Sequence, residues 1–244
     1  MSCNVVLILT HSGDYFTVDR VAEALSKRGV RPFRLDTDKF PLEVQLAVRF
    51  DSSGLTNQLK YGDKFVEREE VQAVWMRRLW QPQLSEDLAP QFQEACARES
   101  LATLHGFLDG LGDIYWLDNL ERIREAENKL RQLRVATEVG LTIPHTLVTN
   151  DPQEARQFFQ QLQGKMVAKL LTPISFGMEA SSFFVYTSVV KEEDLLEAEM
   201  LRYSPMVFQE QIPKLRELRV VFVAGNFFAG ALDASRYQAK TLDW

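Results

Sequence analysis

The sequence predicts an α/β protein in which a parallel sheet comes first and an antiparallel sheet follows. Three observations favour this fold class. Residues 5–36 read as a buried strand, an amphipathic helix and a second strand, the order of a β-α-β unit. Within residues 165–232, apolar strands follow one another with short turns, which is typical of antiparallel pairing. The length of 244 residues is sufficient for two compact cores.

The first region begins with the β-α-β unit. The apolar run VVLIL (5–9) is typical of a strand buried on both faces, and PFRLD (32–36) is the second strand. The helix between them closes at Gly29 and has one apolar face, formed by Val18, Val21, Ala22 and Leu25. The loop THSGD after the first strand indicates an anion-binding turn or, as the favoured interpretation, ordinary helix-cap residues at Ser12 and Asp14.

The rest of the first region adds strands of two kinds and one helix. LEVQLAVRF (42–50) alternates apolar and polar residues, which predicts a half-exposed strand. VQAVWM (71–76) predicts another buried strand. A helix is expected from about Ala89 to Phe107, and the region ends near Trp116.

The second region combines helices with closely spaced strands. Its first helix is expected from Leu120 to Val139, with Gly140 as the C-cap and Pro144 beyond it. Further helices are predicted at 152–163 and 191–202, and strands at 145–149, 165–171, 182–187, 206–212, 217–223 and 227–232. The short turns between these strands favour one antiparallel sheet.

The composition is that of a soluble globular protein and argues against several function classes. The net charge of −6 leaves no basic surplus, so a general nucleic-acid binder is not expected. No apolar run is long enough to span a bilayer. Two separated cysteines, Cys3 and Cys96, indicate a reducing compartment, so we expect a cytoplasmic protein without membrane contact. The three histidines lack the spacing of metal ligands: His11, His105 and His145.

Lys169 lies inside the apolar strand MVAKLL, where an ammonium is costly to bury without an anionic partner. The polar segment that follows (172–177) suits a phosphate clamp at this lysine. The alternative is a lysine that reaches solvent from an edge strand. Lys129 lies on a helix crowded with charge, which by itself is typical of a solvated face.

The strand MVFQEQI ends in the polar tip Gln-Glu-Gln (209–211). An exposed backbone N–H and C=O at such a strand end can hold an adenine ring, here between Glu210 and Ile212. Glu217 would then bind ribose hydroxyls, and Arg219, on the same face of the next strand, would point toward phosphates. The alternative is a β-meander with a polar turn and a cross-strand Glu–Arg pair.

Together these features resemble the ATP-grasp ligases. NKL (128–130) ahead of VGLTIPHT, the strand lysine of MVAKLL, FQEQI and ELRVVFV occur in that family's order and spacing. THSGDYFTVDRVAEAL, RPFRLDTDKFP and VWMRRLWQP resemble the N-terminal domain of the microviridin-type, or graspetide, peptide cyclases. THSGDYFTVDR is more similar to the lactam-forming members than to the lactone-forming ones. The resemblance covers essentially the whole chain.

The resemblance implies an ATP-grasp fold with three parts. An N-terminal α/β pre-ATP-grasp domain would span residues 1–116, a central subdomain 117–204, and the beginning of a C-terminal subdomain 205–244. ATP-grasp ligases hold magnesium through a late Asp and a Glu-x-Asn segment, which do not occur before Trp244. The resemblance therefore implies metal ligands beyond Trp244 and a C-terminal subdomain that is incomplete in this chain.

The resemblance also implies roles within an ATP site. Lys129 and Lys169 would contact the phosphates beneath a loop at 172–181, and Arg219 would stabilise the transferring phosphoryl group. Catalysis would thus rest on Arg219 and Lys169, with ATP and Mg²⁺ as cofactors. The other nucleotide-binding residues would be Gln209, Glu210, Gln211, Ile212 and Glu217. Weaker candidates for contacts with the phosphoryl group are Arg236 and Lys240.

The implied reaction is the ATP-dependent macrocyclisation of a ribosomally made precursor peptide, in which an Asp or Glu acyl phosphate is closed to a lactam by a Lys amine. The precursor's helical leader would dock beside the acidic helix KEEDLLEAEMLR, at Glu192, Glu193 and Asp194, although these residues also suit a helix cap. Arg77 and Arg78 would face the cleft or form a plain surface pair. The alternatives are a truncated, non-catalytic module that binds leader peptide and nucleotide, and a ligase for another carboxylate and amine. A homodimer stays open.

Overall fold

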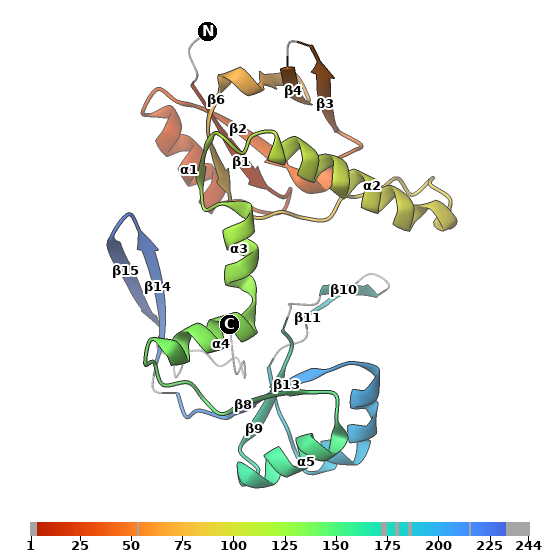
Figure 1. The fold of residues 1–244 in the computed structure, drawn as a ribbon, viewed down its shortest axis with the longest axis vertical. Helices are drawn as coiled ribbons and strands as arrows, with labels where there is room; N and C mark the ends of the chain where they lie inside the picture. The colour runs from red at the N-terminus through yellow and green to blue at the C-terminus, as the bar shows by residue number, and fades with distance from the viewer. Residues whose placement is uncertain are drawn as a thin grey trace. The chain divides into compact units, whose positions relative to one another are not determined.

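The computed structural model describes residues 4–52, 54–171, 187–214 and 216–232, together with the backbone at 175–178 and 181–184. The chain forms two compact units, Met1–Glu125 and Ala126–Trp244, which are coloured red to yellow-green and green to blue in Figure 1. The domain boundaries predicted at residues 116 and 204 stay predictions. Within the described residues, no helix is both long enough and apolar enough to cross a membrane.

A four-stranded parallel sheet forms the centre of the first unit, in the order β2-β1-β6-β7. Its strands are β1 (Val5–Thr10), β2 (Arg31–Asp36), β6 (Val71–Met76) and β7 (Tyr115–Leu117). Both faces of β1 are buried, because Leu7 packs into one apolar cluster and Ile8 into another. The helix α1 (Thr17–Ser26) joins β1 to β2 and adds Val18 to the cluster around Ile8. The predicted β-α-β unit is confirmed.

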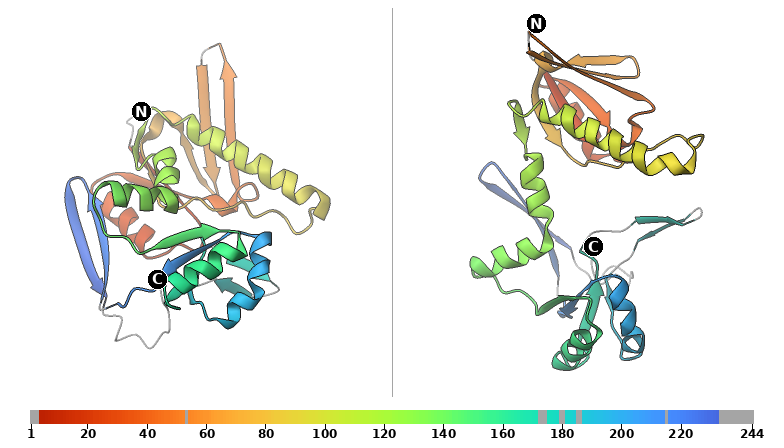
Figure 2. Two further views of the ribbon diagram at one scale, coloured as in Figure 1. Left: turned by 60° about the horizontal axis from the view of Figure 1, so that its bottom comes forward. Right: turned by 45° about the vertical axis from the view of Figure 1, so that its right-hand side comes forward.

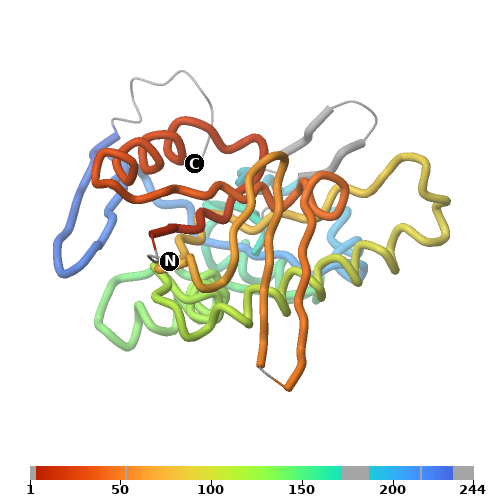
Figure 3. The backbone as a smooth tube through the Cα atoms, turned by 90° about the horizontal axis from the view of Figure 1, so that it is seen from above, coloured from red at the N-terminus to blue at the C-terminus, as the bar shows by residue number. Residues whose placement is uncertain are grey.

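A three-stranded antiparallel sheet also belongs to this unit, made of β3 (Val44–Asp51), β4 (Gly54–Tyr61) and β5 (Lys64–Glu67). Figure 3 shows β3 and β4 as a projecting orange hairpin. Val44 is buried, but Phe50 is 80% exposed, because the far end of the hairpin extends beyond the core. The predicted helix is α2 (Pro90–Asp109), whose Leu104 packs into the cluster around Leu7. Two 3-10 helices are η1 (Thr37–Lys39) and η2 (Arg68–Glu70).

The helix predicted from Leu120 to Val139 is instead two helices, α3 (Leu120–Glu127) and α4 (Lys129–Glu138). Asn128 between them has extended backbone dihedrals, and its side chain accepts a hydrogen bond from the Arg131 N–H at 3.1 Å. Asn128 is therefore the N-cap of α4. The prediction was wrong because an asparagine within a helical pattern can start a second helix as a cap.

The main sheet of the second unit is antiparallel throughout, in the order β12-β9-β13-β8. Its strands are β8 (Thr146–Thr149), β9 (Met166–Lys169), β12 (Ser188–Val189) and β13 (Met206–Glu210). The helix α5 (Pro152–Gln161) and the 3-10 helix η3 (Glu193–Tyr203) lie next to each other in Figures 1 and 2. Both pack on one face of the sheet, through Ala155, Met166, Ala198, Leu201 and Phe208. The acidic helix predicted at 191–202 corresponds to η3 (Glu193–Tyr203), which is a 3-10 helix.

Two hairpins are separate from the main sheet. β10 (Ser175–Met178) pairs with β11 (Ser181–Phe184), and β14 (Glu217–Val223) pairs with β15 (Asn226–Leu232). The single antiparallel sheet predicted for this region is therefore three sheets, because the strands pair locally. Strand β10 occupies part of the segment predicted as a phosphate-covering loop, whose residues 172–174 and 179–180 lie outside the described residues.

Candidate active site

Side chains from three neighbouring strands of the main sheet gather on the face opposite α5. In β9 and β13, Met166 and Phe208 point into the α5 cluster, so Lys169 and Gln209 lie on the other face. Gln209 pairs in register with Thr146 of β8, which places Thr146 on that face as well. This face brings together two residues predicted for nucleotide binding and one that the sequence did not indicate.

Lys169 is half-buried, and its ammonium donates a hydrogen bond to Gln209 Oε1 at 2.6 Å. The Gln209 amide donates in turn through Nε2 to Thr146 Oγ1 at 2.8 Å. Because β9 lies between β12 and β13, it is not the edge strand that the alternative assumed. Gln209 thus contacts a predicted phosphate-binding lysine through its side chain.

Lys129 is the first residue of α4, where it follows the Asn128 cap. Its Nζ donates to the Leu170 carbonyl oxygen at 2.9 Å, so its ammonium reaches the residue directly after Lys169. The two lysines predicted to contact phosphates therefore lie at the same end of β9. Two lysine side chains that contact the same strand suit a polyanionic ligand.

The polar tip of β13 has most of its backbone donors occupied. The Glu210 N–H donates to the His145 carbonyl and the Gln211 N–H to the Lys165 carbonyl, each at 2.9 Å. Ile212 is half exposed, and its N–H has no hydrogen-bond partner among the residues that the structure describes. The predicted adenine contact from a backbone N–H is therefore available at Ile212 and not at the two residues before it.

Glu217 and Arg219 lie two residues apart on β14, so they share a face of that strand as predicted. The Glu217 carboxylate is largely buried and accepts a hydrogen bond from Lys214. Arg219 is exposed and has further contacts of its own. The weaker candidates Arg236 and Lys240 lie outside the described residues.

The acidic residues predicted for leader binding lie at the start of η3. Asp194 Oδ2 accepts a hydrogen bond from the Lys191 N–H at 2.8 Å, whereas the N-cap residue, Glu192, makes no side-chain capping bond. Glu192, Glu193 and Asp194 are all exposed. Asp194 thus bonds the backbone just before the helix, and the side chains of Glu192 and Glu193 are exposed.

The loop THSGD does not cap α1, and that prediction is wrong. The helix starts at Thr17 after Phe16, and no side chain bonds its N-cap. Ser12 instead donates to Asp38 and so connects the segments that follow β1 and β2, while Asp14 accepts from Thr10 at the end of β1, at 2.9 Å. Arg77 lies 3.6 Å from Asp14, which makes it part of a half-buried ion pair.

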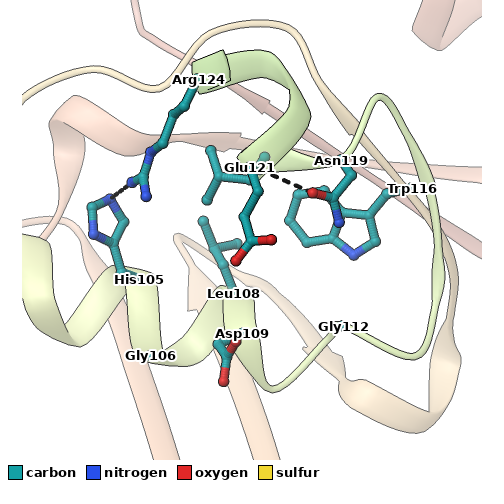
Figure 4. Close-up of a pocket in the computed structure, with 10 residues that line it drawn as sticks. His105, Gly106, Leu108, Asp109, Gly112, Trp116, Asn119, Glu121 and Arg124 are labelled. Atoms are coloured by element: carbon teal, nitrogen blue, oxygen red, sulfur yellow. Dashed lines mark hydrogen bonds between the residues drawn. The ribbon is translucent and has the colours of Figure 1, made fainter. Parts of the chain in front are cut away.

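A cavity of about 420 Å³ in the first unit was not indicated by the sequence (Figure 4). Its wall contains His105, whose Nε2 accepts a hydrogen bond from the Arg124 guanidinium at 3.0 Å. Burial lowers the pKa of His105 below its usual value, and the Arg124 guanidinium lowers it further. The neutral imidazole therefore accepts from Arg124. The Glu121 carboxylate points into the same cavity.

Among the described residues, no group of three or more His, Cys, Asp or Glu side chains could hold a metal ion. The prediction that the metal ligands lie elsewhere is compatible with this arrangement and is not tested by it.

Comparisons with known proteins identify the family. The family model described as the MvdD pre-ATP grasp domain matches residues 5–124. No protein in a search of curated sequences matches the chain significantly. Among solved structures, the macrocyclase MdnB from Microcystis aeruginosa MRC is 61% identical with a TM-score of 0.84, over 96% of this chain and 76% of that one.

Two further solved structures contain peptide ligands. The macrocyclase MdnC from the same organism, bound with precursor peptide MdnA, is 35% identical with a TM-score of 0.89, over 96% of this chain and 77% of that one. A RiPP-associated ATP-grasp ligase from Chryseobacterium gregarium, in complex with ADP and a leader and core peptide, is 34% identical with a TM-score of 0.87, over 99% of this chain and 72% of that one.

These similarities confirm the predicted ATP-grasp fold with its N-terminal pre-ATP-grasp domain. The chain spans about three quarters of the length of these three proteins. It belongs to the microviridin-type ATP-grasp peptide macrocyclases, a family of carboxylate–amine ligases.

Proposed function

We propose that the chain is an ATP-dependent ligase that macrocyclises a ribosomally made precursor peptide through lactam links between Asp or Glu and Lys side chains. The observation that carries the proposal is that two lysine side chains meet β9: the Lys129 ammonium bonds the Leu170 carbonyl oxygen, next to Lys169, and the Lys169 ammonium bonds Gln209. Two lysine side chains that contact the same strand suit the phosphates of ATP. The ligands of the two similar structures, a precursor peptide in one and ADP with leader and core peptides in the other, support the proposal.

In the proposed reaction a peptide carboxylate oxygen attacks the γ-phosphorus of ATP, the bond to the bridging oxygen breaks, and ADP leaves. A lysine amine of the same peptide then attacks the acyl carbon, loses one proton, and inorganic phosphate leaves. Lys129 and Lys169 would neutralise phosphate charge, and Arg219 would stabilise the transferred phosphoryl group. The protein's contribution is therefore to position the reactants and to balance charge.

The proposal also assigns contacts for adenine, ribose and the leader peptide. The Ile212 N–H would meet adenine and Glu217 the ribose, while the leader would lie against Glu192 and Glu193. Magnesium is the expected cofactor of such a phosphoryl transfer. Within the described residues, no cluster of three or more His, Cys, Asp or Glu side chains could hold it. An ATP-dependent reaction and the two separated cysteines favour a cytoplasmic location.

The test is to incubate the chain with ATP, Mg²⁺ and a leader-bearing precursor, and to measure the peptide mass. We expect one water to be lost per ring, and the loss should disappear when the core lysine is replaced by arginine. A product that forms without the lysine but needs a core Ser or Thr, and that mild base hydrolyses, would contradict the lactam. Peptide and nucleotide binding without any mass change would favour a non-catalytic binding module.

A further inference from the structure

Hydrogen bonds link the side chains of Lys169, Gln209 and Thr146, and the donor and the acceptor of each bond can be assigned. The Thr146 hydroxyl donates to the Pro144 carbonyl oxygen at 2.9 Å. A hydroxyl has only one proton to donate, so toward Gln209 the same oxygen acts as an acceptor. It accepts from Gln209 Nε2 at 2.8 Å. This contact turns the Gln209 carbonyl oxygen toward Lys169 Nζ, at 2.6 Å.

The opposite orientation of the Gln209 amide is disfavoured at both ends. It would direct the NH₂ group at the Lys169 ammonium, where two donors face each other without an acceptor. It would also leave the Thr146 oxygen, whose proton is used at Pro144, opposite a carbonyl oxygen. The hydrogen bonds therefore favour one orientation of the Gln209 amide. Thr146, on the neighbouring strand β8, fixes that orientation by accepting from Gln209 Nε2.

We infer that Gln209 is a positioning residue for Lys169, and that Thr146 fixes the amide of Gln209 for that purpose. The inference rests on the proposed role of Lys169 at the ATP phosphates. A lysine side chain has several rotatable bonds, so an acceptor that holds its ammonium in place reduces the ordering cost when ATP binds. Gln209 suits this role because its amide is neutral and does not cancel the lysine charge, as a carboxylate would.

Four variants test the hydrogen-bond network of Lys169, Gln209 and Thr146. Q209L removes the acceptor, Q209E keeps an acceptor but adds a negative charge, T146V replaces the hydroxyl by a methyl group of the same size, and T146S keeps the hydroxyl. Calorimetric titration with ATP should show about tenfold weaker binding for Q209L and about three- to fivefold weaker binding for T146V, the usual cost of losing a hydrogen bond to a charged or a neutral group. Q209E should weaken ATP binding at least as much as Q209L, and T146S should restore it to within about twofold.

A double variant separates positioning from a general structural effect. If Thr146 acts only through Gln209, T146V should have no further effect on ATP affinity in a Q209L background. The matched control is Q58L, which removes a strand glutamine that bonds Glu67 in the first unit and should leave ATP affinity unchanged. Full additivity of T146V and Q209L, or equal weakening by T146V and T146S, would overturn the inference.

A measurement without ATP distinguishes this inference from the proposed function. A hydrogen-bond acceptor stabilises the charged amine, so Q209L should lower the pKa of Lys169, followed by NMR of isotope-labelled lysines with K169R for assignment. An unchanged Lys169 pKa in Q209L would overturn the positioning role of Gln209 and leave the proposed function unaffected. Failure of the unchanged chain to bind ATP would overturn the proposed nucleotide site, and the positioning role with it.

Discussion

The parallel sheet of the first unit and the main sheet of the second unit use their faces differently. In the first unit, Leu7 and Ile8 on opposite faces of β1 both have 0% exposure, so packing occupies the two sides. In the second unit, α5 and η3 cover one face, and the opposite face carries Thr146, Lys169 and Gln209. Buried polar groups need partners, so residue choice on that face is governed by hydrogen bonding as well as by packing. One sheet is therefore packed on both faces, whereas the other carries a network of hydrogen-bonded polar side chains on one face.

The largest effect on activity should come from the polar face. We expect K169M to lower ATP-dependent turnover by about 10²- to 10³-fold, the usual effect of removing one electrostatic contact to a developing charge. Its unfolding free energy should change by less than about 1 kcal/mol, because Lys169 is only half-buried. Turnover assays and urea unfolding of the same preparations provide the check, with K64M on the exposed end of β5 as the control. Equal losses in K169M and K64M would remove the distinction between the two sheets.

The largest effect on stability should come from the parallel sheet. We expect I8A to lower the unfolding free energy by about 2–5 kcal/mol, because the side chain is fully buried and its removal leaves a cavity. V220A on the exposed hairpin should change it by less than about 0.5 kcal/mol. Urea unfolding measures both variants. A cost for I8A as small as that for V220A would show that the face of β1 toward α1 is not a packed core.

The smallest effect concerns the His105 cavity in the first unit. Burial lowers the pKa of His105 in the folded state, so the folded protein binds a proton there less readily than the unfolded chain does. The stabilising contribution of the neutral imidazole is therefore present above the unfolded pKa of about 6.5 and is lost as the pH falls through the folded pKa. NMR titration should place the pKa of His105 below its usual value, and R124M should raise it. A pKa that R124M does not move would show that the guanidinium has no influence.

The parallel sheet could be predicted from the sequence because its signal is local. The unbroken run VVLIL indicates burial on both faces, and the apolar spacing from Val18 to Leu25 indicates the helix that covers one of them. The break at Asn128 could not be read in the same way, because capping depends on backbone dihedrals that one asparagine does not reveal.

The candidate site could be predicted only in part. Lys169 was indicated by its place in an apolar strand and Lys129 only by the resemblance, yet the approach of Lys129 to the residue after Lys169 depends on a contact across 41 residues of sequence. Thr146 gave no signal at all, since a threonine is ordinary in a strand. Its role depends on the register of β13 against β8, which brings together residues 63 positions apart.

The β14–β15 hairpin affects how the protein behaves in solution. It exposes large apolar side chains on both faces, at Leu218, Val220, Val221, Phe222, Val223, Phe227 and Phe228. Within the described residues, each of its strands pairs only with the other, so each leaves one edge of N–H and C=O groups available to another chain. A net charge of −6 gives only modest repulsion between molecules. Residues 217–232 are therefore the part of the described chain with the largest run of exposed apolar side chains beside unpaired strand edges, the combination that favours contact with another polypeptide.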